Sequence, residues 1–442
     1  MSLSQIIKRD GNLVAYDLER IATAIFKASA TDGGDFESAE AVARKVERQL
    51  EANYGRTSIP TVEDIQDVVE DVLLREGHTR TARAYMIYRN DRARARAARV
   101  GSVEATDNIP YKVIYEVLRW NLDHGCDTVD TLNQTIAEGR LPDLVAASEE
   151  RYSQEVLQCA DRVTERPDVR LIIIAGPSSS GKTTTTIKLS ERLREAGREL
   201  VALNVDHYFF DLEQHPKDEF GDYDYETPHA LDLPLIRRHL EELITGRTVR
   251  IPFYDFKTGR RSLEAQKMSL APHQILLIDS LHGLYDGMTC GIPANQTFRL
   301  YIETLGQLRN GEGVFMRWAD NRLLRRMIRD SWHRNHQPMQ TLTHWHYVRA
   351  SELKYIIPYI GSVDAVVNSA LPYELPILKH HLFSFFPDAV ETFRTDAKRQ
   401  DAYLRARRVL DLLAPLTAVP DAGIVPESSL LREFIGGSRY TY

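Results

Sequence analysis

Residues 176–183 read Gly-Pro-Ser-Ser-Ser-Gly-Lys-Thr, which is the pattern G-x-x-x-x-G-K-T. The apolar run Leu171–Ala175 comes just before them, and a helix-forming stretch follows from Thr184. A buried strand, a glycine-rich loop and a helix start in this order predict a phosphate-binding loop. Its glycines let backbone N–H groups point at phosphate oxygens, beside the positive end of the helix. We therefore expect the chain to bind a nucleoside triphosphate; the alternative is a chance glycine–serine turn.

Two side chains of this loop have a further chemical role. Lys182 supplies a positive charge for the outer phosphates, and Thr183 offers a hydroxyl to Mg²⁺. The residues expected to bind the nucleotide are Gly176, Ser178, Ser179, Ser180, Gly181, Lys182, Thr183 and Thr184.

The composition narrows the class of protein. A length of 442 residues predicts two or three domains, and 43% hydrophobic residues are ample for their cores. A formal net charge of −7 leaves no overall basic field for nucleic acid or an anionic membrane. Cys126, Cys159 and Cys290 lie far apart and form no C-x-x-C pattern, which favours a reducing compartment. Because no signal-like start and no bilayer-length apolar run is seen, we expect a cytoplasmic protein without nucleic-acid or membrane partners.

Residues 1–95 are predicted to form a small, mainly helical domain that opens on a β-hairpin. The strands Gln5–Arg9 and Asn12–Tyr16 flank Asp10-Gly11, a strong signal for a tight turn. Helices are predicted over 17–30 and 38–53, from about residue 61, and from residue 78. Thr61 and Asp64 predict a capping box at the start of the third helix, with Asp in place of the usual Glu.

The rest of the chain divides into a connector and a larger domain. Residues 96–165 carry no evident chemistry, and we expect a helical connector there. Residues 166–442 alternate strands with helices, which is typical of an α/β domain whose mostly parallel sheet is flanked by helices. The predicted strands are Leu171–Ala175, Leu200–Val205, Gln274–Asp279, Thr297–Ile302 and Ala365–Asn368.

Two acids stand at the carboxyl ends of predicted strands, where ligands of open α/β sheets bind. Asp206 follows the second strand; it can accept the proton of an attacking hydroxyl or hold Mg²⁺. Asp279 ends the run Ile275–Ile278, as in a Walker B segment, and is expected to coordinate or orient the metal. The alternatives are a helix or loop cap for Asp206 and a structural turn residue for Asp279.

Four arginines share one face of a predicted helix. Arg322, Arg325, Arg326 and Arg329 follow each other at i, i+3, i+4 and i+7, and Arg334 comes shortly after. Mobile arginines can offset the negative charge on a transferring phosphoryl group when a lid closes. The alternative is a charged face in contact with solvent.

The rear region resembles the uridine kinase and phosphoribulokinase family of P-loop kinases. It is most similar to the bacterial branch that adds an N-terminal domain to a uridine kinase-like core. Beyond the phosphate loop and the arginine helix, the motifs that carry the resemblance are Asp206–Phe209, Asp224–Asp232, Ile251–Phe256, Asn368–Leu375 and Ser429–Gly437.

This resemblance implies roles for individual residues. It implies that Asp206 is the general base, that Glu226 grips the ribose hydroxyls and that Tyr225 lies beside the nucleobase. Catalytic roles are implied for Lys182, Arg326 and Arg329, and Tyr208, Tyr225, Glu226, Arg326 and Arg334 are expected to bind the acceptor or its phosphates. For the metal it implies Thr183, Asp279 and Asp206.

The chain departs from the family pattern at several positions. Asp279 stands where the family usually has Glu, which shortens the reach to the metal but keeps the charge. Gly259 replaces a histidine that many uridine kinases use near the base, and His336 replaces a second lid arginine. The parts that transfer the phosphoryl group are retained, whereas the parts that read the base are not.

The front region resembles the ATP-cone, a regulatory nucleotide-binding module. The matching residues are Ile7–Gly11, Tyr16-Asp17, Arg20-Ile21 and the segment 82–89. Lys8 and Arg9, beside the turn at Gly11, are expected to face the phosphates of a bound nucleotide. The alternative is an ordinary Asp-Gly hairpin with two exposed cations.

The sequence thus predicts an ATP- and Mg²⁺-dependent kinase acting on a small molecule, with uridine or cytidine as the expected acceptor. Regulatory ATP or dATP is expected at the front domain, and a homo-oligomer is expected. Two alternatives stay open, namely a kinase for another sugar-like alcohol and a nucleotide-gated regulator without kinase turnover.

Overall fold

The chain forms two compact units. The computed structural model describes residues 5–7, 13–29, 34–54, 59–97, 108–217, 223, 225, 227–333, 337–396 and 399–442. The first unit, called the helical unit below, consists of Met1–Ala105 and Phe385–Arg408. The second, called the sheet unit, consists of Thr106–Ser384 and Val409–Tyr442. The boundaries expected at residues 95 and 165 stay predictions.

The helical unit contains the predicted hairpin and four helices. Strand β1 (Gln5–Ile7) pairs antiparallel with β2 (Leu13–Ala15), while the turn between them lies outside the described residues. The helices are α1 (Leu18–Ser29), α2 (Phe36–Tyr54), α3 (Val62–Arg75) and α4 (Thr79–Ala97). The predicted capping box is confirmed at α3, since the Thr61 and Asp64 side chains each accept a hydrogen bond from the other residue's backbone N–H.

A segment from late in the chain completes the core of the helical unit. Helix α14 (Phe385–Phe393) and the first part of α15 (Gln400–Leu413) belong to this unit. The Tyr403 ring of α15 lies 6.0 Å from the Phe26 ring and 5.2 Å from the Phe36 ring, and all three side chains are buried. A front domain cut from the chain at residue 95 would therefore lose part of its aromatic core.

The sheet unit contains one parallel five-stranded sheet, in the order β4-β7-β3-β8-β9. Its strands are β3 (Leu171–Ala175), β4 (Glu199–Ala202), β7 (Gln274–Asp279), β8 (Thr297–Glu303) and β9 (Ala365–Asn368). All five predicted strands and the parallel α/β class are confirmed. Strand β4 ends before the predicted Val205, because the Asn204 side chain caps a short 3₁₀ helix that begins there.

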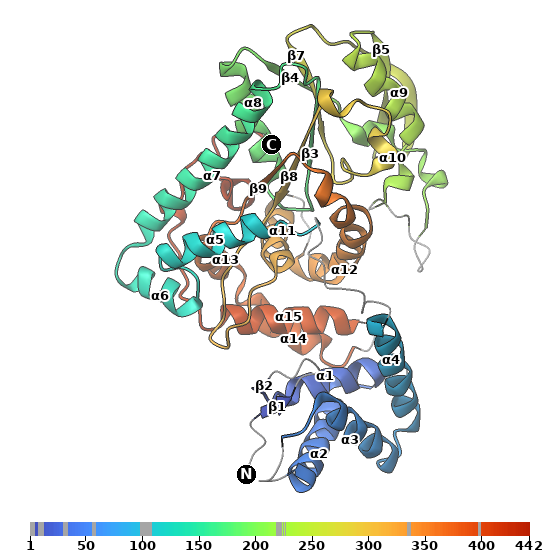
Figure 1. Cartoon of the computed structure of the whole chain (residues 1–442), viewed down its shortest axis with the longest axis vertical. Coiled ribbons are helices and arrows are strands. Elements are labelled where there is room, and N and C mark those ends of the chain that lie inside the picture. The colour runs from blue at the N-terminus through green and yellow to red at the C-terminus, as the bar shows by residue number, and fades with distance from the viewer. Residues whose placement is uncertain are drawn as a thin grey trace. The chain divides into compact units, whose positions relative to one another are not determined.

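Helices cover both faces of this sheet (Figure 1). All five residues of β3 are buried, and alternate side chains of a strand face opposite sides. Ile173 joins a core cluster with Ile236 and Leu240 of α9 (Leu233–Ile244). On the other side lies α8 (Lys182–Glu195), against which α7 (Leu141–Thr164) runs. Burial on both faces explains why the strands read as continuous apolar runs.

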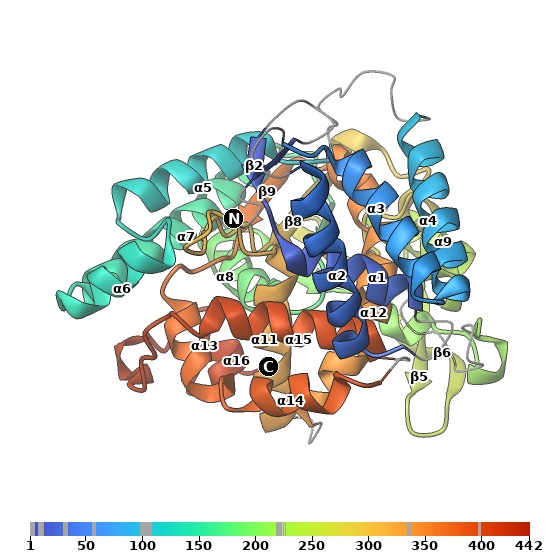
Figure 2. The same cartoon turned by 90° about the horizontal axis from the view of Figure 1, so that it is seen from below.

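The predicted connector is helical and belongs to the sheet unit. It contains α5 (Tyr111–Asp123), α6 (Val129–Ala137) and α7, which gather on one side of that unit in both views (Figures 1 and 2). The backbone of Arg309, in the loop after β8, bonds to Asp127 and Val129 and so ties the connector to the sheet.

The remaining elements surround the carboxyl edge of the sheet. They are β5 (Val249–Asp255) and β6 (Arg260–Met268), which pair as an antiparallel hairpin, with α10 (Asp286–Thr289), α11 (Trp318–His333), α12 (Pro338–Tyr355), α13 (Glu374–Leu382) and α16 (Arg432–Ile435). Within the described part of the chain, no helix is long and apolar enough to cross a membrane.

Candidate active site

The glycine-rich loop joins β3 to α8, as the motif predicts. Two of its glycines are required by close contacts. A Cβ on Gly176 would lie 2.3 Å from the carbonyl oxygen of Ile302 in β8. Gly181 has φ +85°, which side-chain-bearing residues rarely adopt, and a Cβ there would lie 2.4 Å from Leu430. The loop therefore follows this path only because both positions lack a side chain.

The loop presents unsatisfied polar groups. Ser179 has φ 61°, and the Oγ atoms of Ser179 and Ser180 are buried with no hydrogen-bond partner among the described residues. The Lys182 Nζ donates to the carbonyl of Gly176 at 3.0 Å, and Thr183 is exposed in the first turn of α8. Orphaned hydroxyls beside a lysine and a helix N-terminus fit the phosphate groups of a nucleotide.

Lys182, Asp206 and Asp279 are electrostatically coupled. Burial lowers the pKa of Lys182, and the negative charges of Asp279 and then Glu433 oppose this shift. Burial raises the pKa of Asp206, opposed by His207 and Lys182. Burial also raises the pKa of Asp279, which Lys182 lowers and the charges of Glu433 and Asp206 raise further. Because Asp206 follows β4 and Asp279 ends β7, the two acids stand at the same edge of the sheet as the loop.

These acids also fit a divalent cation. Both carboxylates have raised pKa values because of burial, and a nearby positive ion would favour their charged forms. Among the described residues no cluster of three or more His, Cys, Asp or Glu side chains could hold a metal ion. Mg²⁺ needs no such cluster in a nucleotide site, since one or two carboxylates and the phosphates hold it together with water. Thr183, Asp279 and Asp206 are the groups that would serve it here.

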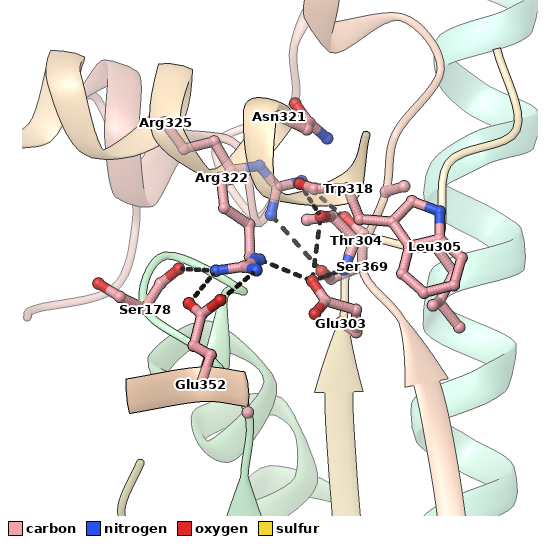
Figure 3. Close-up of polar contacts among 12 residues, drawn as sticks. Ser178, Glu303, Thr304, Leu305, Trp318, Asn321, Arg322, Arg325, Glu352 and Ser369 are labelled. Carbon is pink, nitrogen blue, oxygen red and sulfur yellow. Dashed lines mark hydrogen bonds and ion pairs between the residues drawn. The ribbon is translucent and has the colours of Figure 1, made fainter. Parts of the chain in front are cut away.

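The arginine helix does not have one uniform face. Arg322 and Arg325 are both fully buried, so neither a solvent-facing surface nor a mobile lid describes them. Arg322 bonds to Glu352 with both Nη atoms, at 2.5 and 3.0 Å, and forms an ion pair with Glu303 at 2.7 Å (Figure 3). Arg325 binds Glu374 at 2.6 and 2.9 Å. These two arginines are structural, because carboxylates pair with them away from water.

The other two arginines of α11 lie closer to solvent. The side chains of Arg326 and Arg329 are 16% and 18% exposed, and both contact Asp330. Arg326 Nη1 donates to the Ser178 hydroxyl of the loop at 3.2 Å, while Arg322 reaches the Ser178 carbonyl at the same distance. The positive charge of Arg329 lowers the pKa of Lys182. Helix α11 thus places two cations beside the loop and two in the core.

An aromatic cluster lies next to Asp206, on the side of β4. The Phe209 ring is 5.7 Å from Tyr225 and 5.5 Å from Tyr254, and His215 lies 4.9 Å from Tyr225. Tyr225 is 40% exposed and available to a ligand. Tyr208, expected to contact the acceptor, is instead fully buried, with its hydroxyl 2.9 Å from His239 Nδ1. Its ring belongs to the same hydrophobic core as Phe209 and Tyr254, and it supports the aromatic cluster from that core.

Gly259 has a conformation that its family counterpart, a histidine, would not easily adopt. Its φ is +66°, and a Cβ there would lie 2.8 Å from the Leu212 Cβ. The Leu212 backbone N–H donates to the Gly259 carbonyl at 2.9 Å. The space beside this turn is therefore filled by the 3₁₀ helix Leu212–Gln214.

Several expected site residues lie outside the described residues, and their roles stay predictions. They are Lys8, Arg9 and Gly11 of the front domain and Glu226 and Arg334 of the rear one.

Comparisons with known proteins agree with this geometry. Residues 171–374 match the description "Phosphoribulokinase / Uridine kinase family", and residues 4–94 match "ATP cone domain". Residues 171–374 are a kinase region of that family. The front region is an ATP-cone.

Curated relatives of the kinase region are uridine kinases. The uridine kinase of Deinococcus deserti is 29% identical over 198 residues, which are 45% of this chain and 86% of the relative. The uridine kinase of Bacillus licheniformis is 30% identical over 160 residues, covering 36% of this chain and 66% of the relative. A solved structure, "Structure of a Possible Uridine Kinase from Bacillus stearothermophilus", matches with TM-score 0.32 and 16% identity over 48% of this chain and 98% of that one.

The structure adds residues to the kinase site that sequence reasoning missed. Glu303, Glu352 and Glu374 neutralise the buried arginines, and Glu433 contacts the first turn of α8. They come from β8, α12, α13 and α16, so no local pattern joins them. Glu374 lies within the Asn368–Leu375 motif and Glu433 within the Ser429–Gly437 motif, and these motifs were the signals available.

Proposed function

We propose that the kinase transfers the γ-phosphoryl group of ATP to the 5′-hydroxyl of a nucleoside, uridine or cytidine. The observation that carries this proposal is the position of Asp206 after β4 and of Asp279 at the end of β7, at the edge of the parallel sheet where the loop with Lys182 begins. A site that only binds nucleotide has no need of an acid placed where Asp206 stands. The uridine kinase names of the curated relatives support the acceptor class.

The residues divide the work of the transfer. Lys182 and the loop N–H groups hold the phosphates of ATP. The acceptor hydroxyl attacks the γ-phosphorus, the bond to the β-phosphate oxygen breaks, and ADP leaves. Asp206 takes the hydroxyl proton, and its raised pKa strengthens it as a base. Arg326 and Arg329 offset the charge that develops on the transferred oxygens.

Mg²⁺ is the metal we propose for this site. Bound near Thr183 and Asp279, it would neutralise phosphate charge and orient the γ-phosphoryl group. The Thr183 hydroxyl and the two acids supply oxygen ligands of the kind that this ion prefers.

An acceptor panel tests the proposal. Purified full-length protein is incubated with ATP, Mg²⁺ and single nucleosides or sugars, and ADP release and the phosphorylated product are measured. We expect uridine or cytidine 5′-monophosphate, and no product from a Lys182→Met control. If ATP is consumed only with a different alcohol, that alcohol and not a nucleoside is the acceptor.

Another sugar-like alcohol is the second candidate acceptor, and Gly259 favours it. The position where many relatives of this family carry a base-contacting histidine has no side chain, and Leu212 fills the neighbouring space. The third candidate function is that of a nucleotide-gated regulator without kinase turnover. No ATP consumption above background with any acceptor would support that function instead.

We further propose that ATP or dATP bound at the ATP-cone regulates the kinase. Its effect on the rate and on the oligomeric state can be measured. Since Tyr403 completes the core of the helical unit, deleting residues 1–95 would expose that core. The sharper test is a Lys8→Ala/Arg9→Ala variant, which should keep its turnover but lose the nucleotide-dependent change in rate or assembly. Unchanged regulation in this variant would contradict the proposal. We also propose that the protein is a homo-oligomer and that it is located in the cytoplasm.

A further inference from the structure

Helix α8 cannot cap its own N-terminus. The first N–H groups of any helix need partners, and a side chain at the N-cap normally supplies one. The N-cap of α8 is Gly181, which has no side chain and makes no side-chain cap hydrogen bond. The conformation of the loop and the contact with Leu430 both require glycine there. A polar partner has to come from elsewhere in the chain.

Glu433 is that partner. Its Oε2 accepts hydrogen bonds from the Thr184 backbone N–H at 3.2 Å and from the Thr184 hydroxyl at 2.7 Å. The Tyr442 hydroxyl lies 3.0 Å from the same Thr184 hydroxyl. Glu433 is 8% exposed, so these bonds form away from most of the solvent. These hydrogen bonds occupy the backbone N–H of Thr184, the third residue of α8. They leave the N–H groups of the first two residues for phosphate.

The segment that carries Glu433 is firmly held. The Ser429 hydroxyl accepts from the Leu431 N–H and contacts the Tyr373 hydroxyl, both at 3.0 Å. Arg432 donates to the carbonyls of Ala422, Val425 and Gly436. Leu430 packs against Gly181, where it would meet any Cβ. Glu433 is therefore positioned before a nucleotide arrives.

We infer that Glu433 is a positioning residue of the phosphate-binding loop, which caps α8 in place of Gly181. This inference rests on the proposed binding of ATP by the loop. It predicts that ATP binding depends on a hydrogen-bond acceptor at position 433.

Binding measurements on the full-length chain test this. ATP with Mg²⁺ is titrated calorimetrically in a Lys8→Ala/Arg9→Ala background, which is expected to remove nucleotide binding at the ATP-cone. Glu433→Ala removes the acceptor of the Thr184 hydrogen bonds, whereas Glu433→Gln keeps an oxygen for Thr184. Glu427→Ala and Glu427→Gln, at an exposed position of the same segment, are the matched controls.

We expect Glu433→Ala to weaken ATP binding about tenfold, or about 1.4 kcal/mol, as for a lost cap. Glu433→Gln should bind within about threefold of the parent near neutral pH.

Two results would overturn the inference. Wild-type affinity in Glu433→Ala contradicts the cap, and an equal loss in Glu433→Gln and Glu433→Ala would show that the acceptor oxygen is not what matters. Should Glu433→Ala not fold, Glu433→Met, which keeps the length of the side chain and removes the acceptor, takes its place. A Lys182→Met variant that binds ATP like the parent would show instead that the loop binds no ATP, which is a failure of the proposed function.

Discussion

The two sides of the kinase site are built differently. On the side of β8 and α11, charged groups are buried and paired, with Arg322 and Arg325 joined to Glu352 and Glu374. On the side of β4, short 3₁₀ helices and partly exposed rings such as Tyr225 surround Asp206. The first side holds the phosphate-binding loop, where we propose that ATP binds, through buried ion pairs. The second side, where we propose that the acceptor binds, presents partly exposed rings instead, so the two sides should respond differently to substitution.

The largest effect is expected at Asp206, on the acceptor side. Asp206→Asn removes the base and should lower kcat by about 10²–10⁴-fold, with little change in ATP affinity. Steady-state rates and calorimetric ATP titration measure the two quantities. Asp168→Asn, at an exposed loop position before β3, is the control and should match the parent. A near-parental rate in Asp206→Asn would remove Asp206 from the mechanism.

The buried ion pairs on the side of β8 and α11, called the donor side here, should contribute to the free energy of unfolding. Arg325→Met leaves Glu374 buried without its cation and should cost about 3–5 kcal/mol of unfolding free energy. Arg326→Met, one position further along α11 and closer to solvent, should cost about 1 kcal/mol. Thermal or urea midpoints of the two variants test the difference. Equal midpoints would show that the two halves of α11 do not differ as their burial indicates.

A smaller effect is expected at Gly259. Gly259→His must adopt φ +66° against Leu212, a strain of about 1–2 kcal/mol. We expect the KM of the acceptor to rise about tenfold while the KM of ATP is unchanged. Adding Leu212→Ala should relieve part of the loss. A parallel rise in the KM of ATP would show that the acceptor side is not independent of the donor side.

The smallest effect concerns pH. The positive charge of His207 lowers the pKa of Asp206, so His207→Gln should raise that pKa. Because Asp206 must be deprotonated to act, kcat/KM falls as pH drops through its pKa, and the fall should begin at higher pH in the variant. A pH–rate profile checks this. An unshifted acid limb would mean that another group controls it.

Much of the fold could be predicted because its signals are local. Strand β3, the glycine loop and the start of α8 are contiguous, and the capping box at Thr61 and Asp64 spans four residues. Asp279 was recognised for the same reason, as it ends an apolar run. Tyr208 shows the limit of such reasoning, because a tyrosine two residues after Asp206 suggests a ligand contact until its burial is known.

The sequence by itself determined the phosphate-binding loop, the five strands and the acids at their ends, since backbone conformation and apolar runs are encoded by neighbouring residues. Only the tertiary structure decided which arginines of α11 reach the loop, that Glu433 caps α8 and that Tyr403 completes the helical unit. Thr184 and Glu433 are separated by 249 residues. The burial of a charge and the identity of its partner depend on packing between such distant segments. A local sequence pattern does not contain this information.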